Sequence, residues 1–144
     1  MLPGLQRIGV LENATNPHWR AVRKEFEQAC RSLGLQPIII DVAAAGELEN
    51  AIAELARRRA QALFVQGDNL FFVNRVPIIS AALRYALPIL AADKVMLEAG
   101  ALVSYTYNLA EQYQRYAGFV DRILRGAKPA DLPIEQPTRF ELGI

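Results

Sequence analysis

The side chains of this sequence that could hold a ligand come in small groups, each directly after an apolar run. Asparagine and aspartate side chains take part in hydrogen bonds, and a lysine adds a positive charge. The candidate ligand-binding residues of this kind are Asn13, Asn16, Asp68, Asn69, Lys94 and Asn108. Together with free N–H groups at helix starts, such residues could bind a carboxylate or another small polar group.

The same residue types are also common at helix starts for purely structural reasons. Asn16 precedes Pro17, which suits the first helical position because its missing N–H is not needed there. Asn108 and Glu111 have the spacing of a capping box in which asparagine replaces serine. For each residue alone, capping is the stronger interpretation, and only convergence at one edge of the fold favours ligand binding.

The aromatic residues near these groups divide between core and crevice. Phe71 and Phe72 are adjacent, so they cannot both face the same core from one helix. We expect one of them to line a crevice, and we take Phe71 as the ligand candidate, because an aromatic wall suits the apolar part of a ligand. Trp19 is in phase with the apolar face of its helix, which predicts core packing. The single histidine, His18, has no nucleophile at a useful spacing, so a catalytic role has no support.

No motif indicates catalysis, a metal or a cofactor. The chain has one cysteine, Cys30, and no Cys/His cluster with the spacing of metal ligands. The turn from Glu12 to Pro17 lacks the glycines that let a backbone approach pyrophosphate, and it lacks the Ser/Thr run of a flavin phosphate site. We therefore expect a binding protein without catalytic residues, metal ligands or cofactor. A redox or racemase-type enzyme is a weaker alternative. Such racemases need two facing acid/base residues, often cysteines, whereas the single cysteine, Cys30, lies mid-helix in phase with the core.

Length and composition indicate one well-buried domain. The chain has 144 residues, of which 52% are hydrophobic. Its 16 basic and 15 acidic residues nearly cancel, so we expect no nucleic-acid partner. The apolar runs are far shorter than the roughly 20 residues of a membrane span. No signal-peptide pattern opens the sequence, so the chain as written would be cytoplasmic.

Short β-rich runs alternate with stretches of helical period, which predicts an α/β domain with a mostly parallel sheet. Strands are expected at residues 7–12, 37–42, 62–66, 87–91 and 102–107. Helices are expected at about 19–33, 47–59, 70–85, 93–100 and 113–124, and Pro77 should kink or split the third. A proline-rich extended segment and a last candidate strand at 138–142 follow.

Five strands with intervening helices fit a doubly wound sheet, with the flavodoxin-like strand order 2-1-3-4-5. In such a sheet every strand-to-helix turn lies at the carboxyl edge, where ligands bind. This fold would bring the candidate residues to one rim.

Four blocks of sequence carry a family resemblance that covers nearly the whole chain. They are Leu2 to Leu5 with Arg7 to Leu11 and Asn13 to Pro17, Asp68-Asn69-Leu70-Phe71-Phe72, Glu98 to Tyr105 with Asn108-Leu109, and Tyr116 to Leu142. Together they resemble the substrate-binding proteins of one ABC-transporter family, whose better-known members bind aromatic amino acids such as tryptophan or phenylalanine.

The resemblance implies a periplasmic-binding-protein-like single lobe, the second of the family's two. Residues 1–126 would form the ligand-binding lobe, and residues 127–144 the extended segment that in the family returns to the other lobe. The first turn, the Asp68-Asn69 turn and the turn from Ser104 to Asn108 would face the ligand. The family usually has glycine after the Ser-Tyr pair, whereas Thr106 and Tyr107 stand here, so the bulkier Tyr107 joins the ligand candidates.

The resemblance also implies a small-molecule solute such as an amino acid, an ABC permease as partner, and a periplasmic or extracytoplasmic location. Family members clamp their ligand between two lobes, and this sequence matches one of them. We therefore expect an excised domain or a one-lobe protein, in which a homodimer could supply the second wall. The alternative is a homodimeric sensor or interaction module of the same fold with no transport role.

Overall fold

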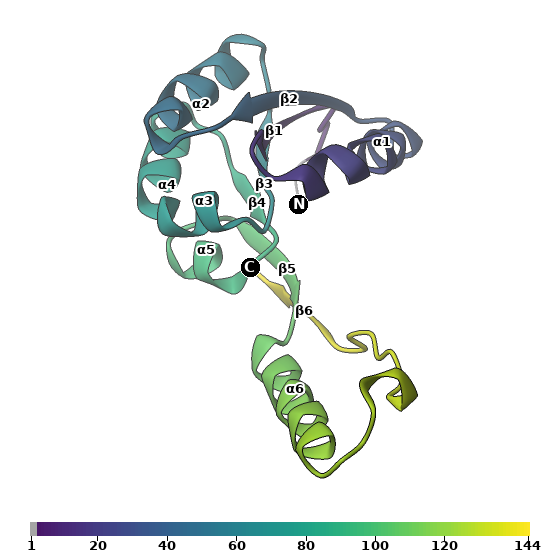
Figure 1. Ribbon diagram of the computed structural model, residues 1–144. Helices are drawn as coiled ribbons and strands as arrows, with labels where there is room; N and C mark the ends of the chain where they lie inside the picture. Colours follow the sequence, from purple (N-terminus) through teal and green to yellow (C-terminus); the bar gives the residue numbers. More distant parts are fainter. Residues whose placement is uncertain (1–2) are drawn as a thin grey trace.

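The computed structural model describes residues 3–144 and contains a sheet of six strands in the order β2-β1-β3-β4-β5-β6 (Figure 1). The strands are β1 (Arg7–Asn13), β2 (Gln36–Val42), β3 (Ala62–Val65), β4 (Ile89–Ala91), β5 (Val103–Tyr107) and β6 (Phe140–Gly143). The first five pair in parallel, and β6 pairs antiparallel to β5. The α/β class and the order 2-1-3-4-5 are confirmed, and the last candidate strand adds a sixth member to the five expected.

Six α-helices connect or follow these strands. They are α1 (Pro17–Ser32), α2 (Leu48–Arg57), α3 (Asn69–Val73), α4 (Arg75–Arg84), α5 (Lys94–Glu98) and α6 (Leu109–Leu124), with 3-10 turns at Ala45–Glu47 and Pro129–Asp131. The single helix expected at 70–85 is split at Asn74. Pro77 consequently lies in the first turn of α4, where its missing N–H breaks no helical hydrogen bond.

The main core lies between one face of the sheet and the helices α2 to α5. Leu63 and Val65 of β3 belong to this core together with Ile52 and Leu55 of α2. Since side chains alternate along a strand, Phe64 faces the other side, where its ring stacks on Phe26 of α1 with centroids 5.4 Å apart. The two faces of the sheet are therefore covered by different helices, as a doubly wound fold requires.

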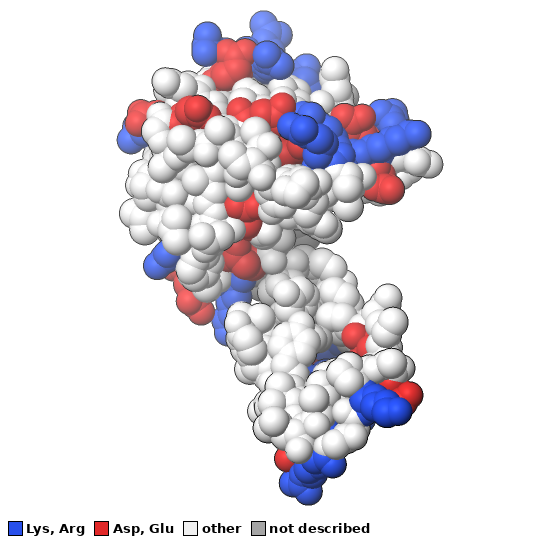
Figure 2. Space-filling model, viewed as in Figure 1, with Lys and Arg blue, Asp and Glu red and all other residues white. Residues whose placement is uncertain are grey.

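Helix α6 does not pack on the sheet. It leaves the carboxyl end of β5 and points away from the rest of the molecule (Figure 1), and Gln112 is its one buried residue. The following segment runs back along the helix, where Arg115 contacts the carbonyl of Gln136 and the hydroxyl of Thr138. We call α6 with residues 125–139 the arm, and the remaining described residues the body. Figure 2 shows a hollow between them.

Candidate functional site at the carboxyl edge

Asp68 joins two strand-to-helix turns at the carboxyl edge of the sheet. Its Oδ1 accepts a hydrogen bond from Asn13 Nδ2 at 2.9 Å, and its Oδ2 accepts one from Asn16 Nδ2 at 2.8 Å. Oδ1 also accepts the backbone N–H of Leu70 at 2.8 Å, so Asp68 caps α3. The structure thus brings together three of the residues named from the sequence, although 52 and 55 positions separate the two asparagines from Asp68.

Both asparagines also hold their own turn. Asn16 Oδ1 accepts the N–H of His18 at 3.0 Å and caps α1. Asn13 Oδ1 accepts the backbone N–H of Thr15 at 3.0 Å and its hydroxyl at 2.7 Å. The capping expected from the sequence is therefore confirmed for Asn16, whereas Asn13 holds its turn without capping a helix; both amides donate to Asp68.

The environment of Asp68 favours its charged form. Burial alone would raise its pKa, but the hydrogen bonds from Asn16, Asn13 and the Leu70 N–H outweigh burial and lower it. The indole N–H of Trp19 lies close enough to lower this pKa further, without making a hydrogen bond of good geometry. Within residues 3–144, no basic side chain lies within 4 Å of this carboxylate. Asp68 is thus an anion held by neutral donors.

Two further polar atoms near this network have no partner in the described part of the chain. They are Nε1 of Trp19 and Oε1 of Gln66, which directly follows β3 and is 4% exposed. Buried polar atoms are nearly always hydrogen-bonded, so each of them suits a water molecule or a ligand atom. Gln66 was not among the candidate residues named from the sequence. The signal for it is a polar residue at the end of an otherwise apolar strand.

The structure reverses the roles expected for the two phenylalanines. Phe71, the ligand candidate, is 1% exposed and lies in the core, because it is the residue of α3 that faces the sheet. Phe72 is 43% exposed, and the guanidinium of Arg75 lies 5.3 Å from its ring centroid. Phe72 is therefore the aromatic side chain available at this edge.

Except for Asn69, which is next to Asp68, the remaining candidates lie at the ends of β4 and β5. Lys94 lines a shallow pocket of about 370 Å³ with Leu97, Ser104, Thr106, Glu141, Leu142 and Gly143. Asn108 caps α6 through the N–H of Glu111 at 2.9 Å, and its Nδ2 donates to Glu141 Oε1 at 2.6 Å. Asn69, the first residue of α3, is exposed, and so is Tyr107. Lys94, Tyr107 and Asn108 form a second part of the rim, separate from the hydrogen-bond network of Asp68.

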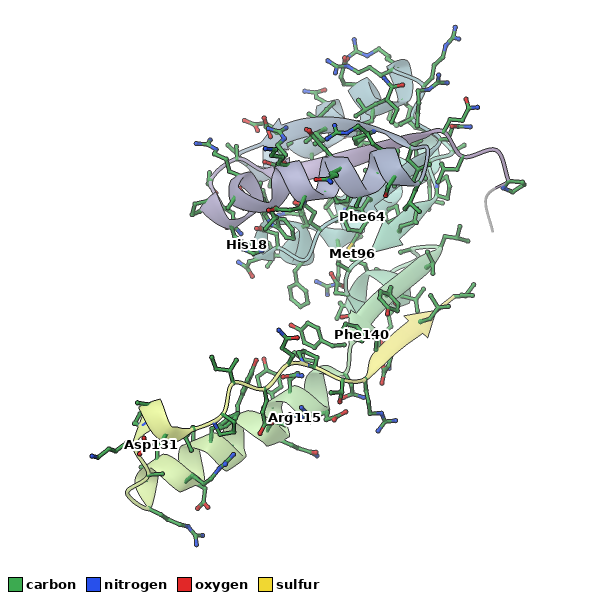
Figure 3. The ribbon with its side chains drawn as sticks, turned by 90° about the vertical axis from the view of Figure 1, so that its right-hand side faces the viewer. His18, Phe64, Met96, Arg115, Asp131 and Phe140 are labelled. Carbon is green, nitrogen blue, oxygen red and sulfur yellow. The ribbon has the colours of Figure 1, made fainter. Side chains whose placement is uncertain are left out.

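The start of α1 and the start of α5 lie on the same side of the body. Figure 3 shows His18 and Met96, which mark these two helix starts, on the side that faces the arm with Arg115 and Asp131. Asp93 caps α5 by accepting the N–H of Met96 at 2.7 Å. The exposed ring of His18 packs edge-on against Trp19, with centroids 5.0 Å apart. The rim therefore faces the hollow between body and arm.

A larger pocket lies elsewhere. It has a volume of about 440 Å³, and its lining is mostly apolar, with Ile79, Leu87, Ile89, Ala101, Leu102 and Ile144 among its residues. Because Leu87 and Ala101 precede β4 and β5, this pocket lies at the amino edge of the sheet. It contains none of the candidate ligand-binding residues.

Residues 3–144 contain no group of three His, Cys, Asp or Glu side chains that could bind a metal ion. No helix in the same range is long and apolar enough to cross a membrane.

Comparison with known proteins places these observations in a family. The family model described as ABC transporter substrate binding protein matches residues 1–144. No curated protein matches the chain.

Several solved structures share the fold at low sequence identity. A conserved domain protein from Vibrio cholerae has a TM-score of 0.92 at 20% identity, over 99% of this chain and 48% of its own. An ABC domain in complex with L-Trp from Streptococcus pneumonia has a TM-score of 0.86 at 21% identity, over 96% and 47%. GanP, a glucose-galactose binding protein from Geobacillus stearothermophilus, has a TM-score of 0.65 at 10% identity, over 96% and 52%. The chain spans about half the length of these proteins.

Proposed function

Because the chain belongs to the family of ABC transporter substrate binding proteins, we propose that its carboxyl-edge rim is one wall of a solute-binding site. The solute is a small molecule with a cationic amino group, such as an amino acid, held without a covalent bond. We also propose that the protein delivers this solute to an ABC permease on the outer side of a membrane.

The unpaired charge of Asp68 carries this proposal. Its carboxylate offers about four lone-pair positions, of which Asn13, Asn16 and Leu70 fill three, and the indole N–H of Trp19 approaches it without a hydrogen bond of good geometry. The lowered pKa keeps it ionised at neutral pH. A partly buried anion without a basic partner is suited to a ligand ammonium group, which would add a charge-assisted hydrogen bond at the remaining position.

Other rim residues fit the rest of an amino acid. The acceptor of Gln66 and the donor of Trp19 lack partners, and Phe72 offers an exposed ring to an apolar side chain. Lys94 lies at the next strand-to-helix turn, after β4, where it could meet a carboxylate. The complex of the Streptococcus structure with L-Trp supports this ligand class for a protein of the same fold, whereas the sugar-binding GanP shows that the fold also serves other ligands.

Isothermal titration calorimetry with L-tryptophan tests the role of Asp68. Asp68→Asn removes the charge but keeps an oxygen that can cap α3, so we expect affinity to fall about tenfold or more while the fold persists. Asp121→Asn is the control, because it also removes one carboxylate charge but lies on an exposed position of α6, paired with Arg125 and outside the rim. Its affinity should equal that of the wild type.

Two analogues separate the ammonium from the rest of the ligand. Tryptamine keeps the ammonium, so its binding should also depend on Asp68. Indole-3-propionate lacks it, and any binding should be the same in wild type and Asp68→Asn. Equal affinity of Asp68→Asn and wild type for L-tryptophan and for other amino acids, or binding of neutral sugars alone, would refute the assignment.

The second candidate function, a homodimeric sensor or interaction module, is favoured by one observation. The arm exposes large apolar side chains that the body does not cover. A surface of this kind suits a protein partner whether or not a solute binds.

A further inference from the structure

Two buried polar atoms of opposite kind lack a partner near Asp68. Trp19 Nε1 carries a hydrogen-bond donor and Gln66 Oε1 is an acceptor, and both are shielded from solvent. Gln66 as a whole is 4% exposed. Buried polar atoms without a partner are rare in folded proteins, so a complementary pair of them in one region calls for a common cause.

Gln66 lies on the side of the sheet that α1 covers. It directly follows β3 and continues the alternation of that strand, so it is in phase with Phe64. The ring of Phe64 faces α1 and stacks there on Phe26. Glu12, at the neighbouring position of β1, also reaches α1, because its carboxylate pairs with Arg23.

Trp19 lies on the face of α1 that packs on this side of the sheet. It precedes Arg23 by four residues and Phe26 by seven, a spacing that keeps all three on one face. At about 1.5 Å per residue, Trp19 is about 10 Å from Phe26 along the helix, toward the carboxyl edge. Gln66 is about 7 Å from Phe64 in the same direction, at about 3.3 Å per residue. Since an indole ring spans the small difference, the two unpaired atoms belong to one region.

In the described part of the chain, the neighbouring donors already have acceptors. The guanidinium of Arg23 contacts carboxylates of β1 and β2 at 3.3 and 3.4 Å, and the amides of both rim asparagines donate to Asp68. Trp19 Nε1 approaches Asp68 without a hydrogen bond of good geometry. The indole N–H thus has two candidate acceptors, Asp68 and Gln66, and is bonded to neither.

A ligand cation would compete with this indole for Asp68. Three of the about four lone-pair positions of the carboxylate are filled by Asn13, Asn16 and the Leu70 N–H. A ligand ammonium needs the fourth position, toward which the indole N–H is directed. Displacement of the indole would leave its N–H buried and unpaired unless another acceptor takes it, which is unfavourable. Gln66 Oε1 is the acceptor without a partner in this region.

We propose that the N–H of Trp19 has two alternative acceptors: Asp68 while its fourth position is free, and Gln66 Oε1 once a ligand cation occupies that position. The second state rests on the proposed function, because it requires an ammonium group at Asp68. Gln66 is then a positioning residue that acts on the ligand through Trp19. The exchange favours cationic solutes, since a charged donor gains more at a carboxylate than a neutral one.

Nuclear magnetic resonance of the indole N–H tests the exchange. Trp19 is the only tryptophan of the chain, so isotope-labelled protein gives one indole cross-peak. Unlabelled L-tryptophan adds no signal and can be titrated to saturation. We expect the cross-peak to move downfield and its proton to exchange more slowly with solvent, because a poor contact becomes a hydrogen bond.

Two glutamine variants separate the acceptor from general effects of substitution. Gln66→Met removes the acceptor at similar volume, so the ligand-induced movement should be absent. Affinity for L-tryptophan should fall about tenfold, since a buried donor is left unpaired in the bound state. Gln28→Met makes the same substitution at an exposed position of α1 and should change neither the movement nor the affinity.

A ligand-free experiment distinguishes the exchange from the proposed function. Asp68→Asn weakens the first acceptor, so the cross-peak should move downfield without ligand, and Gln66→Met in the same chain should abolish the movement. A cross-peak that stays in place in Asp68→Asn, or one that moves equally in chains with Gln66→Met, would overturn the proposal. Binding of L-tryptophan in calorimetry without any movement would overturn the exchange and leave the solute site standing. A Gln66-dependent movement in Asp68→Asn, with no amino acid bound by the wild type, would support the two acceptors and refute the solute site.

Discussion

Replacement of Asn16 separates two contributions to the stability of the rim. Asn16 caps α1 through Oδ1 and donates to Asp68 through Nδ2. Serine can keep the cap, because its hydroxyl reaches the same N–H groups, but it cannot reach Asp68. Asn16→Ser thus removes only the bond between the two turns, whereas Asn16→Ala removes both contributions.

The expected losses follow from these contacts. A hydrogen bond to a charged group contributes about 1.5–3 kcal/mol when buried, and less here because Asp68 is partly exposed. We expect Asn16→Ser to lower the free energy of unfolding by about 1–2 kcal/mol. Asn16→Ala should lose about 1 kcal/mol more with the cap. At a urea slope of about 2 kcal/mol per M, Asn16→Ser would shift the midpoint by about 0.5–1 M.

Urea unfolding followed by circular dichroism at two pH values is the assay. The pKa of Asp68 is below its ordinary value of 3.8 in the folded state, so its bonds contribute stability above that pH and lose it as the pH falls through the folded-state pKa. The difference between wild type and Asn16→Ser should be complete at about pH 7 and should shrink as the pH falls below the ordinary value of 3.8. A Ser variant as stable as the wild type at neutral pH, or a difference that stays constant into acid, would refute the role given to this bond.

Three further predictions concern the sheet, the core and the arm. Burial raises the pKa of Glu12 above 4.5 despite its pairing with Arg23. Wild type should therefore gain stability relative to Glu12→Gln as the pH falls from about 7 toward 4, and urea midpoints at both pH values check the direction of this change. A Cβ at Gly9 would lie 3.0 Å from Leu55 Cδ1, so Gly9→Val should cost about 1–3 kcal/mol of unfolding free energy in the same assay, and an unchanged midpoint would contradict this packing. Arg115→Ala removes the bonds that hold residues 135–138 to α6, so limited proteolysis should cut that segment faster while the unfolding midpoint of the body stays the same.

The sequence predicted the body well because its strands are short apolar runs with clear turn residues between them. Each of the five expected strands is present within two residues, and parallel pairing follows from the helical crossovers between them. Pro77 correctly indicated a break in the helix expected at 70–85, since a proline cannot continue a helical hydrogen-bond pattern.

The contacts of the rim could be predicted only in part. The caps of Asn16, Asp68 and Asn108 follow from residue type next to a helix start. The bonds from Asn13 and Asn16 to Asp68 do not, because they depend on how two distant turns meet in space. The choice between Phe71 and Phe72 failed for a related reason: adjacency shows that one must be exposed, but only the orientation of α3 decides which.

The position of the arm relative to the sheet could not be predicted from the sequence pattern. The apolar residues of α6 recur with the period of a helix that packs on a core. This sequence pattern is the same whether the core belongs to the sheet of this chain or to another protein surface. The exposure of these residues became evident only from the position of the helix at the end of β5.

The most direct test of the solute site is a nuclear magnetic resonance titration of the labelled chain with L-tryptophan, read as backbone amide shifts. The account predicts shifts at residues 13–19, 66–72 and 94–96, which form the rim. It also predicts that the mostly apolar pocket at the amino edge, around Leu87 and Ala101, stays unchanged. Shifts confined to that pocket, or no shifts with any amino acid at high concentration, would contradict a ligand site at the carboxyl edge.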